Sequence, residues 1–277
     1  MTRHARHIPV DNSTLHLPRI LCLHGGGTNA RIFHAQCRAL EQALRPWFRL
    51  CYAEGIFPSQ PGSDVTAVYR DFGPFRAWID PTDTNPRGTS EALHKSIAQA
   101  IAEDNRQHAT GPFVGLLGFS QGAKVCASLI LEQQLMSRGG SARGIEGCGV
   151  NSFPRWRFAV LLAGCGPLVT LSPQSVEADL FHRMGSLWEN DGSDRQNDPK
   201  WPKNLVLTRE LIQVPTIHVH GIRDPNLDLH QKLLYEYFDL RYTQLVEWDG
   251  EHRVPLKAKD VNALVEEINS LWPLVML

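Results

Sequence analysis

Short apolar runs alternate with amphipathic stretches along most of the chain, and this pattern predicts strands alternating with helices. Apolar runs bounded by turn residues are typical of strands buried on both faces. Stretches with apolar residues three and four positions apart are typical of helices with one buried side. Strands are predicted at residues 19–23, 48–53, 112–119, 158–164, 215–221 and 243–248. Helices are predicted after Thr28 or Asn29 up to residue 44, and over residues 93–101, 121–136, 228–238 and 261–271.

Strands joined by helices predict an α/β fold, with a mostly parallel, doubly wound sheet covered on both faces. We expect one domain over residues 1–277 with a core at about 18–272, because no internal repeat and no linker interrupts the pattern. Two stretches lack clear periodicity, and residues 54–88 and 175–210 are expected to form excursions or lids at one edge. Residues 137–157 are expected to form a surface loop. In such sheets ligands bind beyond the carboxyl ends of the strands.

A serine stands on a predicted strand-to-helix corner in the segment GFSQG, residues 118–122. This is the G-x-S-x-G pattern of a nucleophile elbow, in which the flanking glycines leave room for a tight turn. A serine hydroxyl needs a base to take its proton, and the base needs an orienting group. In this kind of sheet the partners follow in the order serine, acid, histidine. The sequence therefore predicts Ser120 as nucleophile, Asp224 as orienting acid and His252 as general base.

Two other acids compete with Asp224 for the orienting role. Asp228 falls within a predicted helix, and Asp249 lies only three residues before His252, so Asp224 is favoured. It directly follows the predicted strand 215–221.

The glycine-rich segment HGGGT, residues 24–28, follows the first predicted strand. An oxyanion hole needs two backbone N–H groups, and one comes from the residue after the nucleophile, here Gln121. The second is predicted at Gly26, with Gly27 as the alternative. His24 is expected to hold this loop. A phosphate-binding loop is disfavoured because both the G-x-G-x-x-G spacing and the P-loop lysine are missing.

Aromatic residues gather in the excursion 54–88, and Phe72, Phe75 and Trp78 are predicted to bind substrate as an apolar wall for a long acyl chain. The alternative interpretation is that these rings fasten the loop to the core. His218 and His220 share one strand face and could ligate a metal. Ile222 stands where a metal site of that pattern needs an acid, so a structural pair is favoured. The sequence predicts neither a metal nor an organic cofactor.

Composition limits the classes of partner. The 28 Lys and Arg residues balance 29 Asp and Glu residues, so no net field would attract nucleic acid or an anionic membrane. Six cysteines are scattered without a C-x-x-C pair, which argues against a disulfide framework or a zinc site. No apolar run has transmembrane length, and the N-terminal stretch lacks the apolar core of a secretory signal. We therefore predict a cytoplasmic protein, although a transit peptide stays open because no acid precedes Asp11.

Five segments resemble a known family: LCLHGGGTNARIF, GPFRAWID, GLLGFSQGAKV, TIHVHGIRDPNLDLHQKLL and LVEWDGEHRVP. They are similar to the fungal serine hydrolases, a branch of the α/β-hydrolases, and particularly to stand-alone thioesterases of fungal polyketide pathways of the lovastatin-release type. The resemblance implies a Ser120–His252–Asp224 triad that cleaves an acyl thioester or ester. It also implies a carrier domain of a polyketide synthase as partner. Basic residues expected at the rim, such as Arg76, Arg155 and Arg157, are candidate contacts for an acidic carrier.

Three alternatives remain at this point, and one of them is a metallohydrolase, whose activity a chelator would abolish. A general carboxylesterase for small or medium acyl esters would use the same residues. A non-catalytic hydrolase-fold binding module would be expected to have lost a triad member, and none is missing here.

Overall fold

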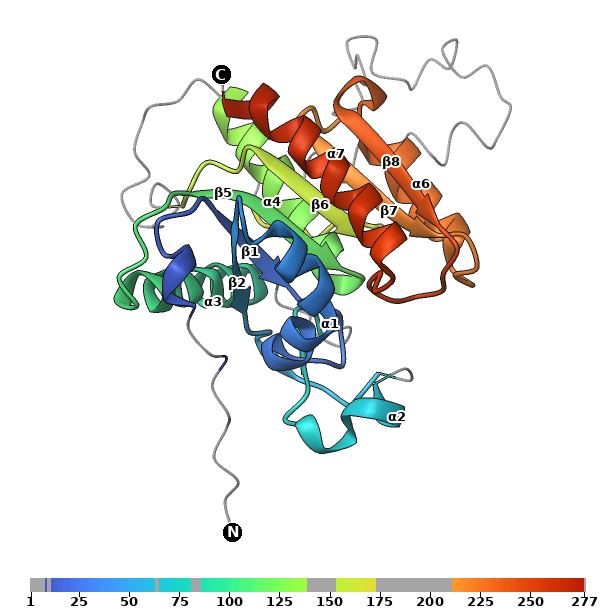
Figure 1. The fold of residues 1–277 in the computed structure, drawn as a ribbon. Coiled ribbons are helices and arrows are strands. Elements are labelled where there is room, and N and C mark those ends of the chain that lie inside the picture. Colours follow the sequence, from blue (N-terminus) through green and yellow to red (C-terminus); the bar gives the residue numbers. More distant parts are fainter. Residues whose placement is uncertain are drawn as a thin grey trace, which may run out of the picture.

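A six-stranded parallel sheet forms the centre of the molecule, with the strand order β2-β1-β5-β6-β7-β8 (Figure 1). The computed structural model describes residue 8 and residues 11–62, 65–80, 86–138, 153–172 and 211–276. The strands of this sheet are β1 (Arg19–Leu23), β2 (Arg49–Ala53), β5 (Phe113–Phe119), β6 (Phe158–Leu162), β7 (Thr216–Gly221) and β8 (Thr243–Trp248). Every neighbouring pair is parallel, so all six carboxyl ends lie at one edge of the sheet.

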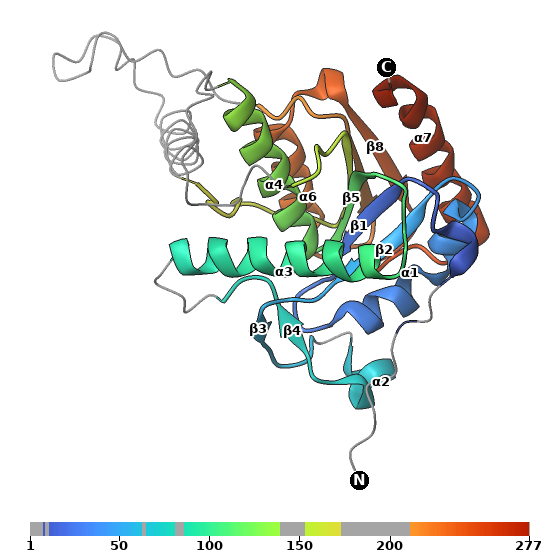
Figure 2. The ribbon, with the colours of Figure 1, turned by 90° about the vertical axis from the view of Figure 1, so that its left-hand side faces the viewer.

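Helices cover both faces of the sheet, which Figure 2 shows between its two helical layers. They are α1 (Ala30–Leu44), α3 (Pro86–Arg106), α4 (Gln121–Arg138), α6 (Leu227–Tyr237) and α7 (Ala258–Met276). Helices α1 and α7 pack on one face, and helices α3, α4 and α6 pack on the other. This topology confirms the predicted α/β-hydrolase fold.

In β1, β2, β5 and β6, alternate residues enter opposite apolar clusters, because successive side chains of a strand point to opposite faces. In β6, Leu161 packs with the α3, α4 and α6 side, whereas Val160 and Leu162 pack with the α1 and α7 side. All three side chains are at most 1% exposed. Burial on both faces explains why these strands appear in the sequence as unbroken apolar runs.

The excursion between β2 and α3 folds back onto the glycine loop. It contains a two-stranded antiparallel sheet of β3 (Phe57–Pro58) and β4 (Arg76–Ala77), with the short helix α2 (Thr66–Tyr69) between them. The Gly27 N–H donates to the Arg76 carbonyl at 2.9 Å, and the Arg76 N–H donates to the Thr28 carbonyl at 2.6 Å. The predicted long loop is therefore partly ordered, and it is joined to the segment that follows β1.

The predicted strands and helices are confirmed, with shifts at their ends. Helix α1 begins after Asn29, whose side chain accepts the Ile32 N–H at 2.8 Å, so Asn29 rather than Thr28 is the cap. Helices α3 and α7 are longer than predicted. The predicted lid 175–210 lies outside the described residues, as does most of the predicted loop 137–157. Among the helices that the structure describes, none is long and apolar enough to cross a membrane.

Candidate active site

Ser120 occupies a strained corner between β5 and α4. Its φ of 52° lies in the left-handed region, which is costly for a residue with a side chain. A Cβ at Gly118 would lie 2.5 Å from the Ala123 nitrogen, and one at Gly122 would lie 2.0 Å from the Leu23 carbonyl oxygen. Both glycines are needed because a side chain at either position would collide with backbone atoms nearby. The corner presents the Ser120 hydroxyl at the carboxyl edge of the sheet.

The three residues predicted as a triad meet at this edge. The Ser120 Oγ lies 3.0 Å from His252 Nε2, and His252 Nδ1 lies 2.7 Å from Asp224 Oδ2. They come from the ends of three strands, since Ser120 follows β5, Asp224 follows β7 and His252 follows β8. The geometry lets the Ser120 hydroxyl donate to Nε2 while the Nδ1–H donates to the carboxylate.

Asp224 is held by hydrogen bonds on both carboxylate oxygens. The Asn226 N–H donates to Oδ1 at 2.9 Å, and the His252 ring contacts Oδ2. Burial alone would raise the pKa of Asp224, but the bonds from Asn226, His230 and His252 outweigh it and lower the pKa below its usual value. Asp224 is therefore a carboxylate at neutral pH. The rival acid Asp249 forms an exposed ion pair with Arg223 at 3.2 Å instead.

A second histidine contacts the same carboxylate, and the sequence analysis did not identify it. His230 of α6 is 1% exposed, and its Nε2 lies 2.9 Å from Asp224 Oδ2. Its Nδ1 lies 2.9 Å from the Gly164 carbonyl oxygen. Asp224 Oδ2 therefore stands between two imidazole rings.

Two backbone N–H groups are free to form an oxyanion hole. Gln121 is the first residue of α4, where an N–H has no acceptor within the helix and the helix dipole favours negative charge. Within the described part of the chain, the Gly26 N–H also has no acceptor, whereas the Gly27 N–H is taken by Arg76. A Cβ at Gly26 would lie 3.3 Å from the Gln121 side chain, so the two residues are neighbours. Gly26 is thus favoured over Gly27.

Trp78 lies in the core, which favours the alternative interpretation that this ring fastens the loop to the core. The side chain is 0% exposed, and its Nε1–H donates to the His24 carbonyl at 2.8 Å. The Trp78 N–H donates to Gln121 Oε1 at 2.7 Å. His24 accepts the Gly55 N–H at Nε2 and contacts the Gly25 carbonyl oxygen through Nδ1, both within 2.9 Å. Trp78 and His24 therefore fasten the glycine loop to the elbow and the excursion.

The other two predicted substrate residues lie nearer to solvent. Phe72 is 37% exposed, its ring packs edge-on against Tyr69, and the Arg31 guanidinium lies 4.8 Å from the ring centre. Phe75 is half-buried in the segment that leads into β4. Asn29 Nδ2 donates to the Phe72 carbonyl at 2.8 Å and so holds this segment against the start of α1. Their contact with substrate stays a prediction.

The histidines of β7 are buried and uncharged. Burial lowers the pKa of His218 to about 3 and that of His220 to about 4. The His218 ring packs edge-on against Phe238 with the ring centres 4.5 Å apart. Neither histidine forms a hydrogen bond to Asp224 among the described contacts. This environment favours the structural pair over a metal site.

Among the described residues, Asp224, His230 and His252 form the one group whose ligand atoms lie within 4.8 Å of one another, as a shared metal would require. Their nitrogens, however, already lie at hydrogen-bond distance from Asp224. A metal at their centre would take the Nδ1 of His252 away from the carboxylate that turns this ring toward Ser120. The arrangement therefore fits a proton-transfer site better than a metal site.

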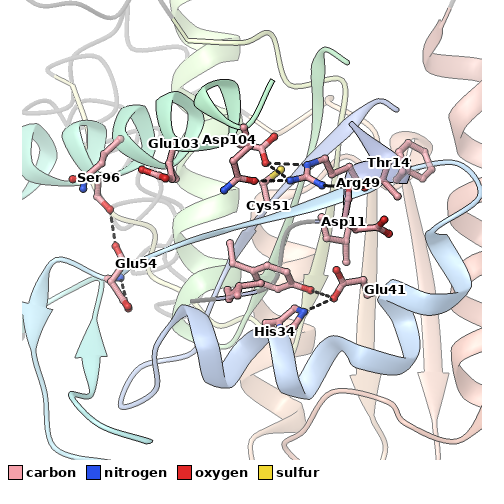
Figure 3. Close-up of a pocket in the computed structure, with 18 of the residues that line it drawn as sticks. Asp11, Thr14, His34, Glu41, Arg49, Cys51, Glu54, Ser96, Glu103 and Asp104 are labelled. Carbon is pink, nitrogen blue, oxygen red and sulfur yellow. Dashed lines mark hydrogen bonds and ion pairs between the residues drawn. The ribbon is translucent and has the colours of Figure 1, made fainter. Parts of the chain in front are cut away.

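A cavity of about 960 Å³ lies beside the outer strand β2, between α1 and α3 (Figure 3). Its polar side chains pair with one another, as Arg49 does with Asp104 at 2.7 Å and His34 does with Glu41 at 3.2 Å. No member of the triad lines it. The reactive groups are thus separate from this cavity.

Two of the predicted carrier contacts lie at the wrong end of the sheet. Arg155 and Arg157 precede β6, and Arg157 Nη1 donates to the Val275 carbonyl near the end of α7. The triad lies where the strands end, so these arginines do not reach its rim. Arg76 stays near the glycine loop through its backbone bonds.

Comparison with known proteins gives one family and several similar chains. A family model described as "Serine hydrolase (FSH1)" matches residues 13–264. Esterase tropF of Talaromyces stipitatus is 67% identical, and the alignment covers 95% of this chain and 85% of that protein. Esterase dbaE of Emericella nidulans is 50% identical over 93% of this chain and 91% of its own, and esterase pigG of Monascus ruber is 47% identical over 93% and 92%. Among solved structures, acyl-protein thioesterase 2 of Zea mays is 17% identical with a TM-score of 0.49, over 96% of this chain and 97% of its own.

Proposed function

The chain belongs to the serine hydrolase (FSH1) family, and we propose that within it this protein is an esterase with Ser120 as nucleophile, His252 as general base and Asp224 as orienting acid. One observation carries the proposal: a hydroxyl, an imidazole and a carboxylate form a continuous hydrogen-bonded chain at the strand ends, with distances of 3.0 and 2.7 Å. The three similar proteins named above are each called an esterase, which supports the reaction class.

The reaction proceeds as two acyl transfers. His252 Nε2 takes the Ser120 proton as Oγ attacks the substrate carbonyl, and the Gln121 and Gly26 N–H groups hold the resulting oxyanion. The C–O or C–S bond then breaks, and the leaving alcohol or thiol receives its proton from Nε2. Water, deprotonated by the same nitrogen, attacks the acyl-enzyme and releases the carboxylic acid. Asp224 holds the Nδ1–H tautomer and stabilises the imidazolium.

The substrate is an acyl ester or thioester, and we keep a polyketide acyl chain on a carrier domain as the finer proposal. The sequence resemblance supports the carrier-bound thioester, whereas the names of the similar proteins favour an oxygen ester. Turnover of a carrier-bound acyl thioester and of the matching simple ester, measured side by side, separates these substrates. Intact mass after exposure to each one would show whether the acyl group resides on Ser120.

The test of the triad is Ser120→Ala. The variant should lose turnover of an activated ester by about 10⁴- to 10⁶-fold, together with labelling by a fluorophosphonate, because the attacking oxygen is gone. Ser137→Ala is the matched control on the same helix, since Ser137 only donates to the Gln133 carbonyl at an exposed position. Labelling of the Ser120→Ala protein at the normal rate refutes the assignment. Activity lost to a chelator would indicate metal chemistry instead.

A further inference from the structure

His230 contacts the same carboxylate oxygen of Asp224 as His252 does. Both of its ring nitrogens are 2.9 Å from an oxygen, Nδ1 from the Gly164 carbonyl and Nε2 from Asp224 Oδ2. A carbonyl oxygen only accepts hydrogen bonds, so the Gly164 contact requires a proton on Nδ1.

The second contact requires a proton on the other nitrogen. Asp224 is ionised because its hydrogen bonds outweigh the effect of burial and lower its pKa. An ionised carboxylate also only accepts, so Nε2 must donate to it. A ring that donates from both nitrogens is an imidazolium. With side chains 1% and 0% exposed, His230 and Asp224 would then be a buried pair of opposite charges.

We propose that His230 is a positively charged positioning residue, which holds Asp224 through Oδ2, the oxygen that also contacts His252. The inference rests on the proposed triad and extends it from three residues to four. The hydrogen-bonded chain runs from Ser120 through His252 and Asp224 to His230 and ends on the Gly164 carbonyl. Its far end is thus fixed to the backbone after β6.

The described surroundings of His230 contain one compensating charge. Asp224 faces it from the loop after β7, and the His252 ring stacks against it with the ring centres 5.7 Å apart and an angle of 26°. His220 of β7 lies 5.8 Å away, and burial and the charge of His230 lower its pKa to about 4, so it is neutral. The neighbour on its own helix, Asp228, is exposed. A buried imidazolium is therefore balanced by Asp224 alone.

This charge has a consequence for the reaction. When His252 takes a proton, a second positive charge forms at the same carboxylate oxygen, on a ring whose centre lies 5.7 Å from that of His230. The charge of His230 opposes that step, because like charges repel. A neutral ring that merely fills space would have no such effect.

The decisive variant is His230→Gln, which keeps a hydrogen-bond donor and removes the charge. The acid limb of the pH profile of kcat/KM should move up by about one to two pH units, as expected for charges about 6 Å apart at an effective dielectric constant of about 20. His220→Gln is the matched control, because His220 is equally buried, lies next to His230 and carries no charge. The acid limb of this variant should stay in place. An unmoved limb in a folded, fluorophosphonate-reactive His230→Gln protein overturns the proposal.

A second measurement needs no variant and no activity. In ¹⁵N-histidine-labelled wild-type protein, nitrogen chemical shifts should show both ring nitrogens of His230 protonated at pH 7. A single protonated nitrogen would overturn the proposal even if His230→Gln did not fold. Failure of the triad itself is recognised separately, since Ser120→Ala would then keep its turnover while the protonation state of His230 stands as measured.

Discussion

The two glycines at the elbow, Gly118 and Gly122, are required for steric reasons. The G-x-S-x-G pattern predicts this requirement but does not show which atoms would collide. Gly122 crosses the end of β1, where an added Cβ would lie 2.0 Å from the Leu23 carbonyl oxygen and 2.6 Å from that of His24. Neither oxygen can move freely, because both belong to the strand end that leads into the glycine loop. The glycine at position 122 is thus explained by the close approach of the ends of β5 and β1.

Gly122→Ala should therefore be among the most damaging small substitutions in the chain. We expect it to lower the free energy of unfolding by about 3 kcal/mol, because backbone must shift to admit the methyl group. Esterase activity should fall with it, since the same shift displaces Ser120 and the glycine loop. Chemical denaturation and ester turnover measure the two effects.

Gly62→Ala is the control for this prediction. Its Cβ would find ordinary contacts at 3.4 Å to Val65 and 3.5 Å to the Gly26 carbonyl oxygen. We expect a change of less than about 1 kcal/mol. Equal losses in the two variants would contradict the steric account of the elbow.

Individual residues also show which contacts could not be predicted from the sequence. Order and strand-end placement were sufficient to bring Ser120, Asp224 and His252 together. His230 carried a signal too, since it shares the buried helical stripe with Leu233, Leu234 and Tyr237. Its contact with Asp224 depends on how α6 lies against the end of β7, and spacing along the chain does not fix that distance. The two interpretations of Trp78 stayed open for the same reason, because loop aromatics at a surface and in a core look alike in sequence.

At the scale of elements, a buried ion-pair group fixes the amino ends of two strands to α3. Arg19 at the start of β1 and Arg49 at the start of β2 both contact Asp104 of α3, at 3.0 and 2.7 Å. All three side chains are at most 8% exposed. The sequence analysis did not find this group, because Asp104 lies 85 residues from Arg19 and 55 residues from Arg49 along the chain.

Asp104→Asn should cost about 3 kcal/mol of unfolding free energy at pH 7, because two buried guanidinium groups lose their counter-charge. Burial raises the pKa of Asp104, but bonds from Arg49 and Arg19 outweigh it and lower the pKa below 3.8. The stabilisation is thus fully present above the unfolded value, near 3.8, and is lost as the pH falls through the lower folded value. Denaturation curves at several pH values measure the difference.

The exposed pair of Arg223 and Asp249 is the comparison for Asp104. Asp249→Asn should change the unfolding free energy by less than about 1 kcal/mol, because both side chains are more than half exposed. If the difference between wild type and Asp104→Asn stayed constant from pH 7 to pH 2, the ion-pair account would be wrong.

The Gln121 side chain joins the elbow to the excursion, independently of its backbone N–H. It accepts the Trp78 N–H at 2.7 Å, and its Nε2 lies 3.4 Å from the Ile79 carbonyl oxygen. Gln121→Ala should lower kcat/KM by about tenfold, because the glycine loop and β4 lose a tether while the backbone donor stays. The loss of stability should be about 1 kcal/mol.

Gln133→Ala provides the matched control on the same helix. Gln133 also forms two bonds to one loop residue, since it accepts the Trp156 N–H at 2.7 Å and donates to the Trp156 carbonyl at 2.9 Å. It lies three turns further along α4 from Ser120. We expect a similar loss of stability with unchanged turnover. Equal effects of both variants on turnover would show that the Gln121 tether does not act on the site.

At the scale of the whole molecule, the alternation of strands and helices was the part of the fold that the sequence predicted best. Each element carries its own local signal, and the parallel sheet follows from their order. The placement of β2 at one edge and β8 at the other, and the small β3–β4 sheet against the glycine loop, depend on packing between distant segments. The single domain over residues 1–277 stays a prediction.

The single-domain prediction can be tested at β6, because neighbouring residues of this strand pack in opposite apolar clusters. Leu161→Ala should cost about 3 kcal/mol on the α4 side, and Val160→Ala about 2 kcal/mol on the α7 side. In one domain, each loss lowers the midpoint of the same urea transition, followed in parallel by circular dichroism and tryptophan fluorescence. Leu274→Ala, at a position 69% exposed, should leave the midpoint nearly unchanged. Two separated transitions, each sensitive to only one of the β6 variants, would mean that the two faces unfold as independent units and that the single-domain prediction is wrong.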